Sequence, residues 1–321
     1  MCIRYTIDAA KPFPNAPQIP AHGSSDASSS TPERSCQSSM IDNVFSLHQI
    51  SGEDEVTFPF NVNDYQRYVF GDDRLAHHFG TACAKAFIAH GSGSRAARHT
   101  TTPASNQSAA DDVAVAVISG YVPTATHSLR NHFVAYLNRH LISTNANPAL
   151  KIDINVVEES SHGRTGPHTG TEIYCLDRER VGSRTIILLS DIRLSQDLEH
   201  RLRSSLRSQQ ISNPFVFVYL AAITKPSRIC SLSSILSFIV SPSLKDVETM
   251  AQANSFVMNE CFVQYILGQD DEEFCRFLRR QDDCFTRLLL DYAIGGGYYD
   301  NDTYQANVKF MQWEVGTRES M

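Results

Sequence analysis

The sequence predicts an α/β protein with a largely parallel sheet and a C-terminal subdomain made only of helices. Apolar runs of strand length recur between residues 113 and 221, and segments with helical spacing of apolar residues separate them. From about residue 244 onward, only the helical spacing remains. Strands that alternate with helices form βαβ units, which place their strands parallel to one another.

The first half of this pattern contains a helix, a strand and a second helix. The stretch Tyr65–His90 ends in a predicted helix, and Val113–Ser119 (VAVAVIS) is apolar throughout. A continuous apolar strand is typical of a sheet that helices cover on both faces. The two helices each place apolar residues on one face: Leu75, Phe79, Cys83 and Phe87 in the first, and Leu129, Phe133, Tyr136 and Leu137 in the second.

Three more strands are predicted at Lys151–Val157, Thr185–Leu189 and Phe215–Ala221. A helix from Ser195 to about Arg207 separates the last two. Its apolar face carries leucines at every fourth position: Leu198, Leu202 and Leu206.

Beyond about Leu244 the apolar residues recur only at three- and four-residue spacing, which predicts helices. Gly295–Gly297 must interrupt them, because three glycines cost too much backbone entropy inside a helix. The residues that define this spacing are Phe274, Phe277, Leu278, Phe285, Leu288, Leu289 and Tyr292.

Composition divides the chain into three regions. Residues 1–40 are rich in Ser and Pro and are predicted to form a disordered tail, because they cannot bury enough apolar surface. Residues 41–228 are expected to form the α/β core, with residues 91–112 as a polar surface loop. Residues 229–321 are expected to form the helical subdomain.

Charge and hydropathy exclude two classes of partner. The net charge of −7 argues against nucleic acid, which basic side chains must neutralise. The apolar stretch Ile229–Val240 is far shorter than the roughly 20 residues of a membrane-spanning helix. We therefore expect a cytoplasmic protein that binds neither nucleic acid nor membrane.

The turn after Thr185–Leu189 is the first candidate for a ligand site, since ligands of open parallel sheets bind beyond the carboxyl ends of the strands. Asp191 is the carboxylate at the end of this strand, and Ser195 is placed to cap the next helix. Asp191 could meet ribose hydroxyls or Mg²⁺, with the amides at the helix start facing a phosphate. Alternatively, Asp191 is only a turn residue and Ser195 only a cap.

The turn after Val113–Ser119 is the second candidate. It joins the strand to a helix through Gly120, Pro123 and two hydroxyl residues, Thr124 and Thr126. These hydroxyls could donate to phosphate oxygens or simply cap the helix, and from the pattern alone the cap is favoured.

Several segments, in the same order, resemble the ComF-like phosphoribosyltransferases. The similarity runs from about Asp64 to Trp313. The segment DYQRYVFG at residues 64–71 resembles the family's D-Y-S-R-F-K-F-G. Residues 121–133 (YVPTATHSLRNHF) are similar to Y-V-P-T-A-T-F-x-L-K-N-x-F, and Phe217-Val218-Tyr219 and Ala293-Ile294-Gly295 with Tyr298 also match.

The resemblance implies a type I phosphoribosyltransferase fold that binds phosphoribosyl diphosphate with Mg²⁺. Asp191 would hold the ribose or the metal ion, and Ser190 would lie beside it. The 5′-phosphate would lie at Ser195, Gln196 and the following amides. The diphosphate would lie near Thr124, Thr126 and Arg130.

The chain departs from the family pattern at this phosphate turn. The family resembles L-D-D-I-R-I-T-G-x-H-E, whereas residues 189–199 read LSDIRLSQDLE. Ser190 replaces an acidic residue, and Gln196 replaces a glycine that would let amides approach a phosphate. Asp197 adds a negative charge, and two like charges at about 4 Å repel by roughly 1 kcal/mol in water and about 4 kcal/mol near a protein surface.

The leading hypothesis is an enzyme that transfers ribosyl phosphate from this donor to an unknown acceptor, possibly in a specialised biosynthetic route. The alternative is a catalytically inactive relative that senses a nucleotide-like metabolite or binds a partner enzyme. In both cases the expected ligand is a small phosphorylated metabolite, and a homodimer is one expected assembly.

Overall fold

The computed structural model describes residues 44–51, 57–91, 112–158, 172–223, 239 and 241–320. All of these belong to one compact unit. The predicted tail at residues 1–40 and residues 92–111 of the predicted surface loop lie outside the described residues. So does the expected boundary between core and helical subdomain at residues 228 and 229.

The described core is an α/β structure around a six-stranded sheet with the order β1-β6-β5-β2-β3-β4. Every neighbouring pair is parallel except β3 and β4, so the predicted fold class is confirmed. The strands are β1 (Val44–Ile50), β2 (Val113–Ser119), β3 (Leu150–Glu158), β4 (Glu172–Leu176), β5 (Thr185–Arg193) and β6 (Phe215–Ile223).

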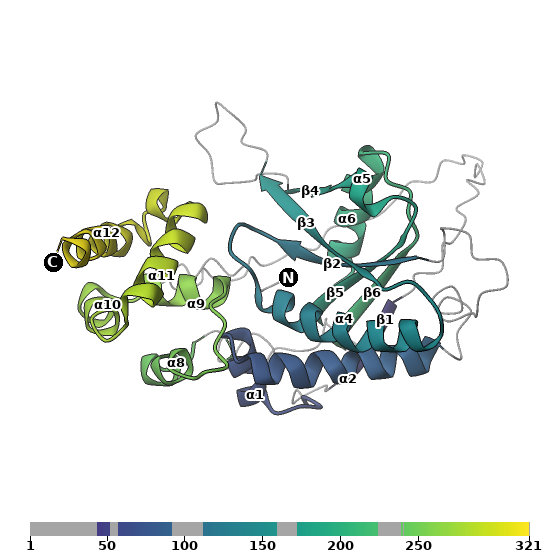
Figure 1. The fold of residues 1–321 in the computed structure, drawn as a ribbon, viewed down its shortest axis with the longest axis horizontal. Coiled ribbons are helices and arrows are strands. Elements are labelled where there is room, and N and C mark those ends of the chain that lie inside the picture. Colours follow the sequence, from purple (N-terminus) through teal and green to yellow (C-terminus); the bar gives the residue numbers. More distant parts are fainter. Residues whose placement is uncertain are drawn as a thin grey trace, which may run out of the picture. The chain divides into compact units, whose positions relative to one another are not determined.

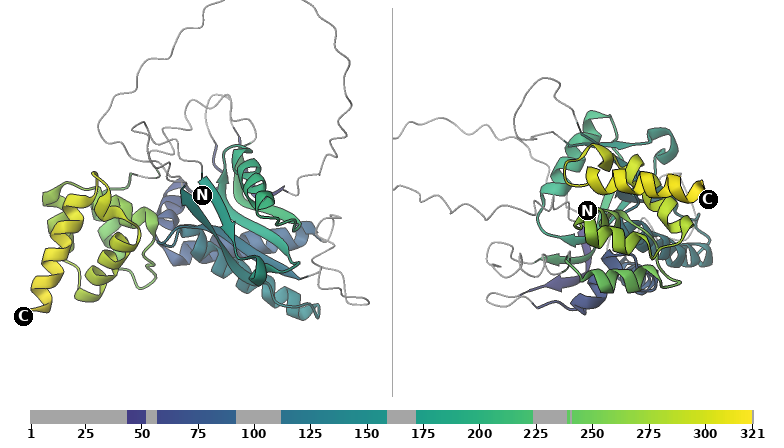
Figure 2. Two further views of the ribbon diagram at one scale, coloured as in Figure 1. Left: turned by 90° about the horizontal axis from the view of Figure 1, so that it is seen from above. Right: turned by 90° about the vertical axis from the view of Figure 1, so that its left-hand side faces the viewer.

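Helices cover both faces of the sheet (Figure 1, Figure 2). Helices α2 (Asp73–Gly91) and α4 (Ala125–Ser143) pack on one face, and α6 (Asp197–Ser208) packs on the other. The apolar run of β2 is therefore almost wholly buried, as the sequence predicted. The leucines of α6 at every fourth position, Leu198, Leu202 and Leu206, pack into the core on their side.

The stretch Tyr65–His90 forms two helices rather than one. Helix α1 (Val62–Val69) ends at Phe70, and α2 begins at Asp73. Gly71 makes the corner between them with a φ of +104°, and a Cβ there would lie 2.3 Å from the Val257 carbonyl oxygen. Only glycine fits this backbone and this close contact. A short helix, α5 (Arg178–Val181), precedes β5.

The C-terminal part is helical, as predicted. It contains α8 (Leu244–Ala251), α9 (Glu260–Leu267), α10 (Asp271–Leu278), α11 (Asp283–Gly295), the 3₁₀ helix η3 (Tyr298–Asp300) and α12 (Gln305–Glu319). Asn259, Asp270 and Asp282 cap α9, α10 and α11 by accepting a hydrogen bond from a backbone amide three residues on. The glycine triplet does end a helix, but Gly295 is still helical and the break follows at Gly296 and Gly297.

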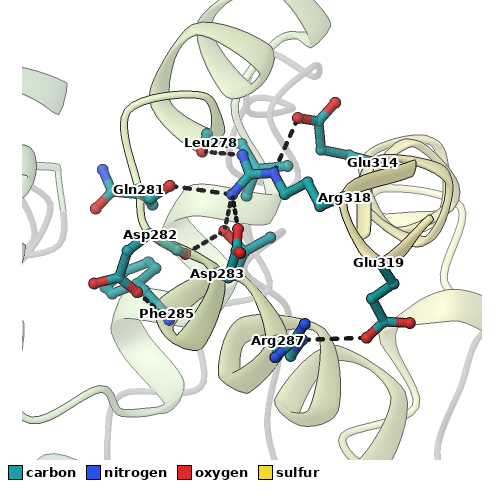
Figure 3. Close-up of polar contacts among 10 residues, drawn as sticks. Leu278, Gln281, Asp282, Asp283, Phe285, Arg287, Glu314, Arg318 and Glu319 are labelled. Atoms are coloured by element: carbon teal, nitrogen blue, oxygen red, sulfur yellow. Dashed lines mark hydrogen bonds and ion pairs between the residues drawn. The ribbon is translucent and has the colours of Figure 1, made fainter. Parts of the chain in front are cut away.

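Arg318 of α12 ties these helices together (Figure 3). Its Nη1 donates to the Gln281 carbonyl oxygen at 3.1 Å, and its Nη2 donates to the Leu278 carbonyl oxygen at 3.2 Å. Further hydrogen bonds reach Asp283 Oδ1 and Thr286 Oγ1. One guanidinium thus binds the end of α10 and the first turn of α11.

No helix among the described residues is long and apolar enough to cross a membrane.

Candidate functional site

The strand order reverses at the centre of the sheet, because β2 is followed by β3 on one side and β5 is followed by β6 on the other. Strands β2 and β5 are parallel neighbours, and their carboxyl ends lie at the same edge. The chain leaves β2 through α4 on one face, and it leaves β5 through α6 on the other (Figure 1). In open parallel sheets, ligands bind outside the carboxyl ends of the strands at such a switch point.

The second half of β5 carries the first candidate residues. Strand β5 continues to Arg193 because its pairing with β6 continues, with Ser190 opposite Tyr219 and Arg193 opposite Ala222. Ser190 and Asp191 therefore lie within the strand and not in the turn that the sequence predicted. They are 2% and 3% exposed. The connecting loop is shorter than expected and consists of residues 194–196.

Asp191 has a partner that sequence reasoning missed. The Tyr68 hydroxyl of α1 donates a hydrogen bond to Asp191 Oδ1 at 2.6 Å, and both side chains are buried. Burial raises the pKa of the Asp191 carboxyl, and the hydrogen bond from Tyr68 acts in the opposite direction. The resemblance offered a signal for this contact, because Tyr68 stands where the family pattern has Phe.

The start of α6 differs from its predicted form. Ser195 is not the N-cap, because Gln196 occupies that position and makes no capping bond through its side chain. The Ser195 hydroxyl instead donates to Asp197 Oδ2 at 2.8 Å and accepts from the Asp197 amide at 3.2 Å. Ser195, Gln196 and Asp197 are exposed. The Ser195 hydroxyl, which was expected to face a phosphate, is thus hydrogen-bonded to the Asp197 carboxylate.

A buried cluster behind this loop was also missed. Arg193 Nε donates to Glu199 Oε1 at 2.6 Å, and the Tyr219 hydroxyl donates to the same oxygen at 2.8 Å. Burial, followed by the negative charge of Glu199, raises the pKa of Tyr219 far above its ordinary value. The cluster fixes the end of β5 to the first turn of α6. Arg193 and Glu199 both stand in the family pattern, which was the available signal.

The turn after β2 is held by its own side chains. The hydroxyls of Thr124 and Thr126 lie 2.6 Å apart, and both residues are buried. The Thr124 amide donates to His127 Nδ1 at 3.0 Å, which closes the first turn of α4. The two threonines are thus brought together at the start of α4: Thr124 is the N-cap, whereas Thr126 lies inside the first turn and is not a cap.

Arg130 is engaged with β3. Its Nη1 donates to the Ile152 carbonyl oxygen and, at 2.5 Å, to Asp153 Oδ1. His127 Nε2 lies 3.6 Å from the same carboxylate oxygen. His127 and Arg130 together hold the pKa of Asp153 well below its usual range. Arg130 is 7% exposed and the Asp153 side chain is 46% exposed, so a ligand would have to compete with a partly exposed ion pair for Arg130.

Among the described residues, no group of three or more His, Cys, Asp or Glu side chains could hold a metal ion by itself. Mg²⁺ at phosphate sites is held by one or two carboxylates together with water and the phosphate oxygens of the ligand. Asp191 is a single carboxyl that accepts a hydrogen bond from Tyr68 and that burial favours in its protonated form, and Ser190 beside it carries no charge. The metal role expected of Asp191 stays a prediction.

Comparisons with known proteins were made for the whole chain. A family model described as PRTase ComF-like matches residues 41–311. No curated protein matches.

Solved structures match with low similarity. A hypoxanthine-guanine phosphoribosyltransferase of L. donovani is 20% identical, with a TM-score of 0.27, and the match covers 46% of this chain and 72% of that one. A Trypanosoma cruzi hypoxanthine phosphoribosyltransferase is 18% identical, with a TM-score of 0.27 and coverages of 48% and 77%. A hypothetical protein from Neisseria gonorrhoeae with bound ppGpp is 11% identical, with a TM-score of 0.23 and coverages of 52% and 92%.

Proposed function

The chain belongs to the ComF-like phosphoribosyltransferase family, and on this premise we propose that it binds a phosphorylated ribose donor at the carboxyl ends of β2 and β5. The observation that carries this proposal is the reversal of strand order between these two parallel strands: β2 is followed by β3 on one side of the pair, and β5 is followed by β6 on the other. It gathers buried hydroxyl and carboxyl groups at one edge of the sheet, where open parallel sheets bind ligands.

In this proposal the turns after β2 and β5 bind different ends of phosphoribosyl diphosphate. Ser190 and Asp191 lie nearest the ribose, and the loop of Ser195 and Gln196 with the amides at the start of α6 takes the 5′-phosphate. The diphosphate lies at the start of α4, with Thr124, Thr126 and Arg130.

The proposed reaction is transfer of the ribosyl phosphate. The bond between ribose C1 and the diphosphate oxygen breaks, that oxygen keeps the electron pair, and a lone pair of the acceptor forms the new bond to C1. Fixed donors at the two turns stabilise the departing diphosphate, so no covalent intermediate with the protein is needed. No step in this scheme depends on a metal ion held by the protein.

A second candidate is binding without turnover, by an inactive relative that senses a nucleotide-like metabolite or supports a partner enzyme. Three contacts favour it. The Tyr68 hydroxyl donates a hydrogen bond to Asp191, and Arg130 donates one to the Asp153 carboxylate. The Ser195 hydroxyl donates one to the Asp197 carboxylate. Each contact engages a group that a donor would use.

Both candidate functions require ligand binding at the carboxyl ends of β2 and β5. Calorimetry with phosphoribosyl diphosphate, with and without Mg²⁺, tests this binding. We expect saturable binding that Asp191→Asn weakens, and no change from Asp300→Asn, which alters an exposed carboxylate in η3. An affinity that Asp191→Asn leaves unchanged would show that the ligand is elsewhere.

A second measurement separates the two candidates. Release of pyrophosphate when candidate amines and nitrogen heterocycles are added supports transfer. Donor binding without release across such a panel supports the inactive relative. Absence of donor binding by the natural protein overturns both.

A further inference from the structure

A cavity of about 510 Å³ is lined by Asn63, Gln66 and Arg67 of α1, and Asp191 is not among its lining residues. Its walls come from α1, the start of α2, α8 and residues 253–256. Backbone hydrogen bonds join these walls: the Asp73 amide donates to the Ser255 carbonyl oxygen, and the Val257 amide donates to the Gly71 carbonyl oxygen, both at 2.9 Å. The cavity is thus framed by main-chain contacts and not by side chains alone.

One wall of this cavity is positively charged. The Asp72 carboxylate, whose side chain is 5% exposed, accepts from Arg67 Nη2 at 2.5 Å and lies 3.7 Å from Arg74 Nε. One carboxylate therefore orients two guanidinium groups and neutralises one of their two charges. Arg67 and Arg74 are 44% and 71% exposed in their side chains. A guanidinium has five N–H donors, so both retain donors that a ligand can use.

The lining also has apolar members. Met250 of α8 is 8% exposed, and the ring of Phe256 is half-buried. A thioether next to an aromatic ring is a favourable environment for another ring. Asp246 at the rim adds a negative charge, although the Ser243 hydroxyl already donates to it at 2.5 Å.

Charge and shape together define the ligand class. With Asp246 included, the two arginines and two aspartates of the lining sum to zero, so a polyanion gains little. A single carboxylate fits the fork of a guanidinium, and an apolar body fits the Met250 and Phe256 side chains of the lining. We propose that this cavity binds a small organic monocarboxylate with an aromatic or branched apolar body, as a site separate from that of the phosphorylated ribose donor.

The two sites share α1. Arg67 lines the cavity, whereas its neighbour Tyr68 contacts Asp191. Consecutive helical residues point about 100° apart, which explains how adjacent side chains serve different sites.

Calorimetry with 3-phenylpropionate as the probe tests the proposal, with the neutral 3-phenylpropionamide as its matched comparison. We expect saturable binding of the acid and about tenfold weaker binding of the amide, since the charge-assisted hydrogen bonds are lost. Arg74→Gln is the decisive variant, because its exposed side chain can be changed without unfolding the wall. Arg280→Gln is its control, since Arg280 lies outside the cavity and is paired with Glu248 at 3.0 Å.

The expected pattern is a loss of about tenfold for Arg74→Gln and for Arg67→Gln, with no change for Arg280→Gln. If Arg67→Gln unfolds by circular dichroism, Arg74→Gln alone decides the result. Equal binding of acid and amide, equal losses in Arg74→Gln and Arg280→Gln, or no saturation at millimolar concentrations overturns the proposal. Displacement of the probe by phosphoribosyl diphosphate would also overturn it, because the site would then not be separate.

Discussion

Gly295 lies directly against the ring of Tyr121. A Cβ atom on Gly295 would lie 1.8 Å from Tyr121 Cε1, so no other residue fits there without movement. Gly295 ends α11, and Tyr121 lies in the loop after β2, so the two residues come from separate segments that both resemble the family pattern. The Glu260 amide adds a hydrogen bond to the Pro123 carbonyl oxygen at 2.8 Å. The C-terminal helices thus support the loop proposed to hold the diphosphate.

Gly295→Ala is expected to displace Tyr121 and this loop. Tyr121 is 67% exposed, so its ring can turn aside and the loss in the free energy of unfolding should stay below about 1 kcal/mol. Urea unfolding should show this small change, and calorimetry should show weaker binding of the donor. Gly316→Ala in α12 is the control, because nothing lies within 4 Å of its Cβ, and it should be neutral or stabilise by up to about 1 kcal/mol. Natural stability and donor affinity in Gly295→Ala would contradict the contact.

Tyr68→Phe removes the hydrogen bond to Asp191 and restores the residue of the family pattern. The buried carboxyl then lacks this donor, so we expect a loss of about 1–3 kcal/mol at neutral pH, measured by denaturant unfolding. Tyr299→Phe changes an exposed hydroxyl and should have no effect. A stability equal to that of the natural protein would mean that the Tyr68 hydroxyl contributes nothing to holding Asp191.

The raised pKa of Asp191 predicts a pH dependence of stability. In the unfolded chain an Asp carboxyl titrates near about 3.9, whereas the folded protein keeps this proton to higher pH. The stabilising contribution of Asp191 is thus complete below the unfolded pKa and is lost as the pH rises through the folded pKa. Asp191→Asn removes this titration. Its free energy of unfolding relative to the natural protein should increase from acidic to neutral pH, and a constant difference would show that Asp191 titrates normally.

Arg318→Lys should weaken the packing of the C-terminal helices. Lysine cannot reproduce the forked contacts of Arg318 with the carbonyl oxygens of Leu278 and Gln281 (Figure 3). Leaving such groups without partners costs about 1–3 kcal/mol in the free energy of unfolding. Arg287→Lys is the control, because its ion pair with Glu319 is half exposed and should contribute less than about 1 kcal/mol. Equal losses in the two variants would contradict this role.

Residues 189–199 depart from the family pattern at three positions. The triple variant Ser190→Asp, Gln196→Gly and Asp197→Ser brings this segment closer to that pattern. Asp197 is exposed, so its repulsion of a phosphate is near the lower value of about 1 kcal/mol, or roughly fivefold in affinity. We expect calorimetry to show at least this gain in affinity for phosphoribosyl diphosphate. Asp271→Ser is the control, because Asp271 is the first residue of α10, just as Asp197 is the first residue of α6. If the natural protein already binds tightly and the triple variant does not improve, the native loop is specialised for another ligand.

The elements that depend on local side-chain pattern could be predicted from the sequence. The apolar run of β2, the leucine spacing of α6 and the helical C-terminal region follow from side-chain periodicity, and the structure contains them. The family also followed from short segments in a fixed order, and the match over residues 41–311 confirms it.

The contacts within the candidate site could not be predicted from local pattern, because they depend on how distant segments pack. Strand β5 continues through Ser190 and Asp191 because β6 offers pairing partners there, which no property of residues 189–193 reveals. Tyr68 meets Asp191 across 123 residues of sequence, and Arg130 of α4 meets Asp153 of β3. Periodicity reports which face of an element is buried, whereas the partner of a buried polar group is set by which distant segments pack together.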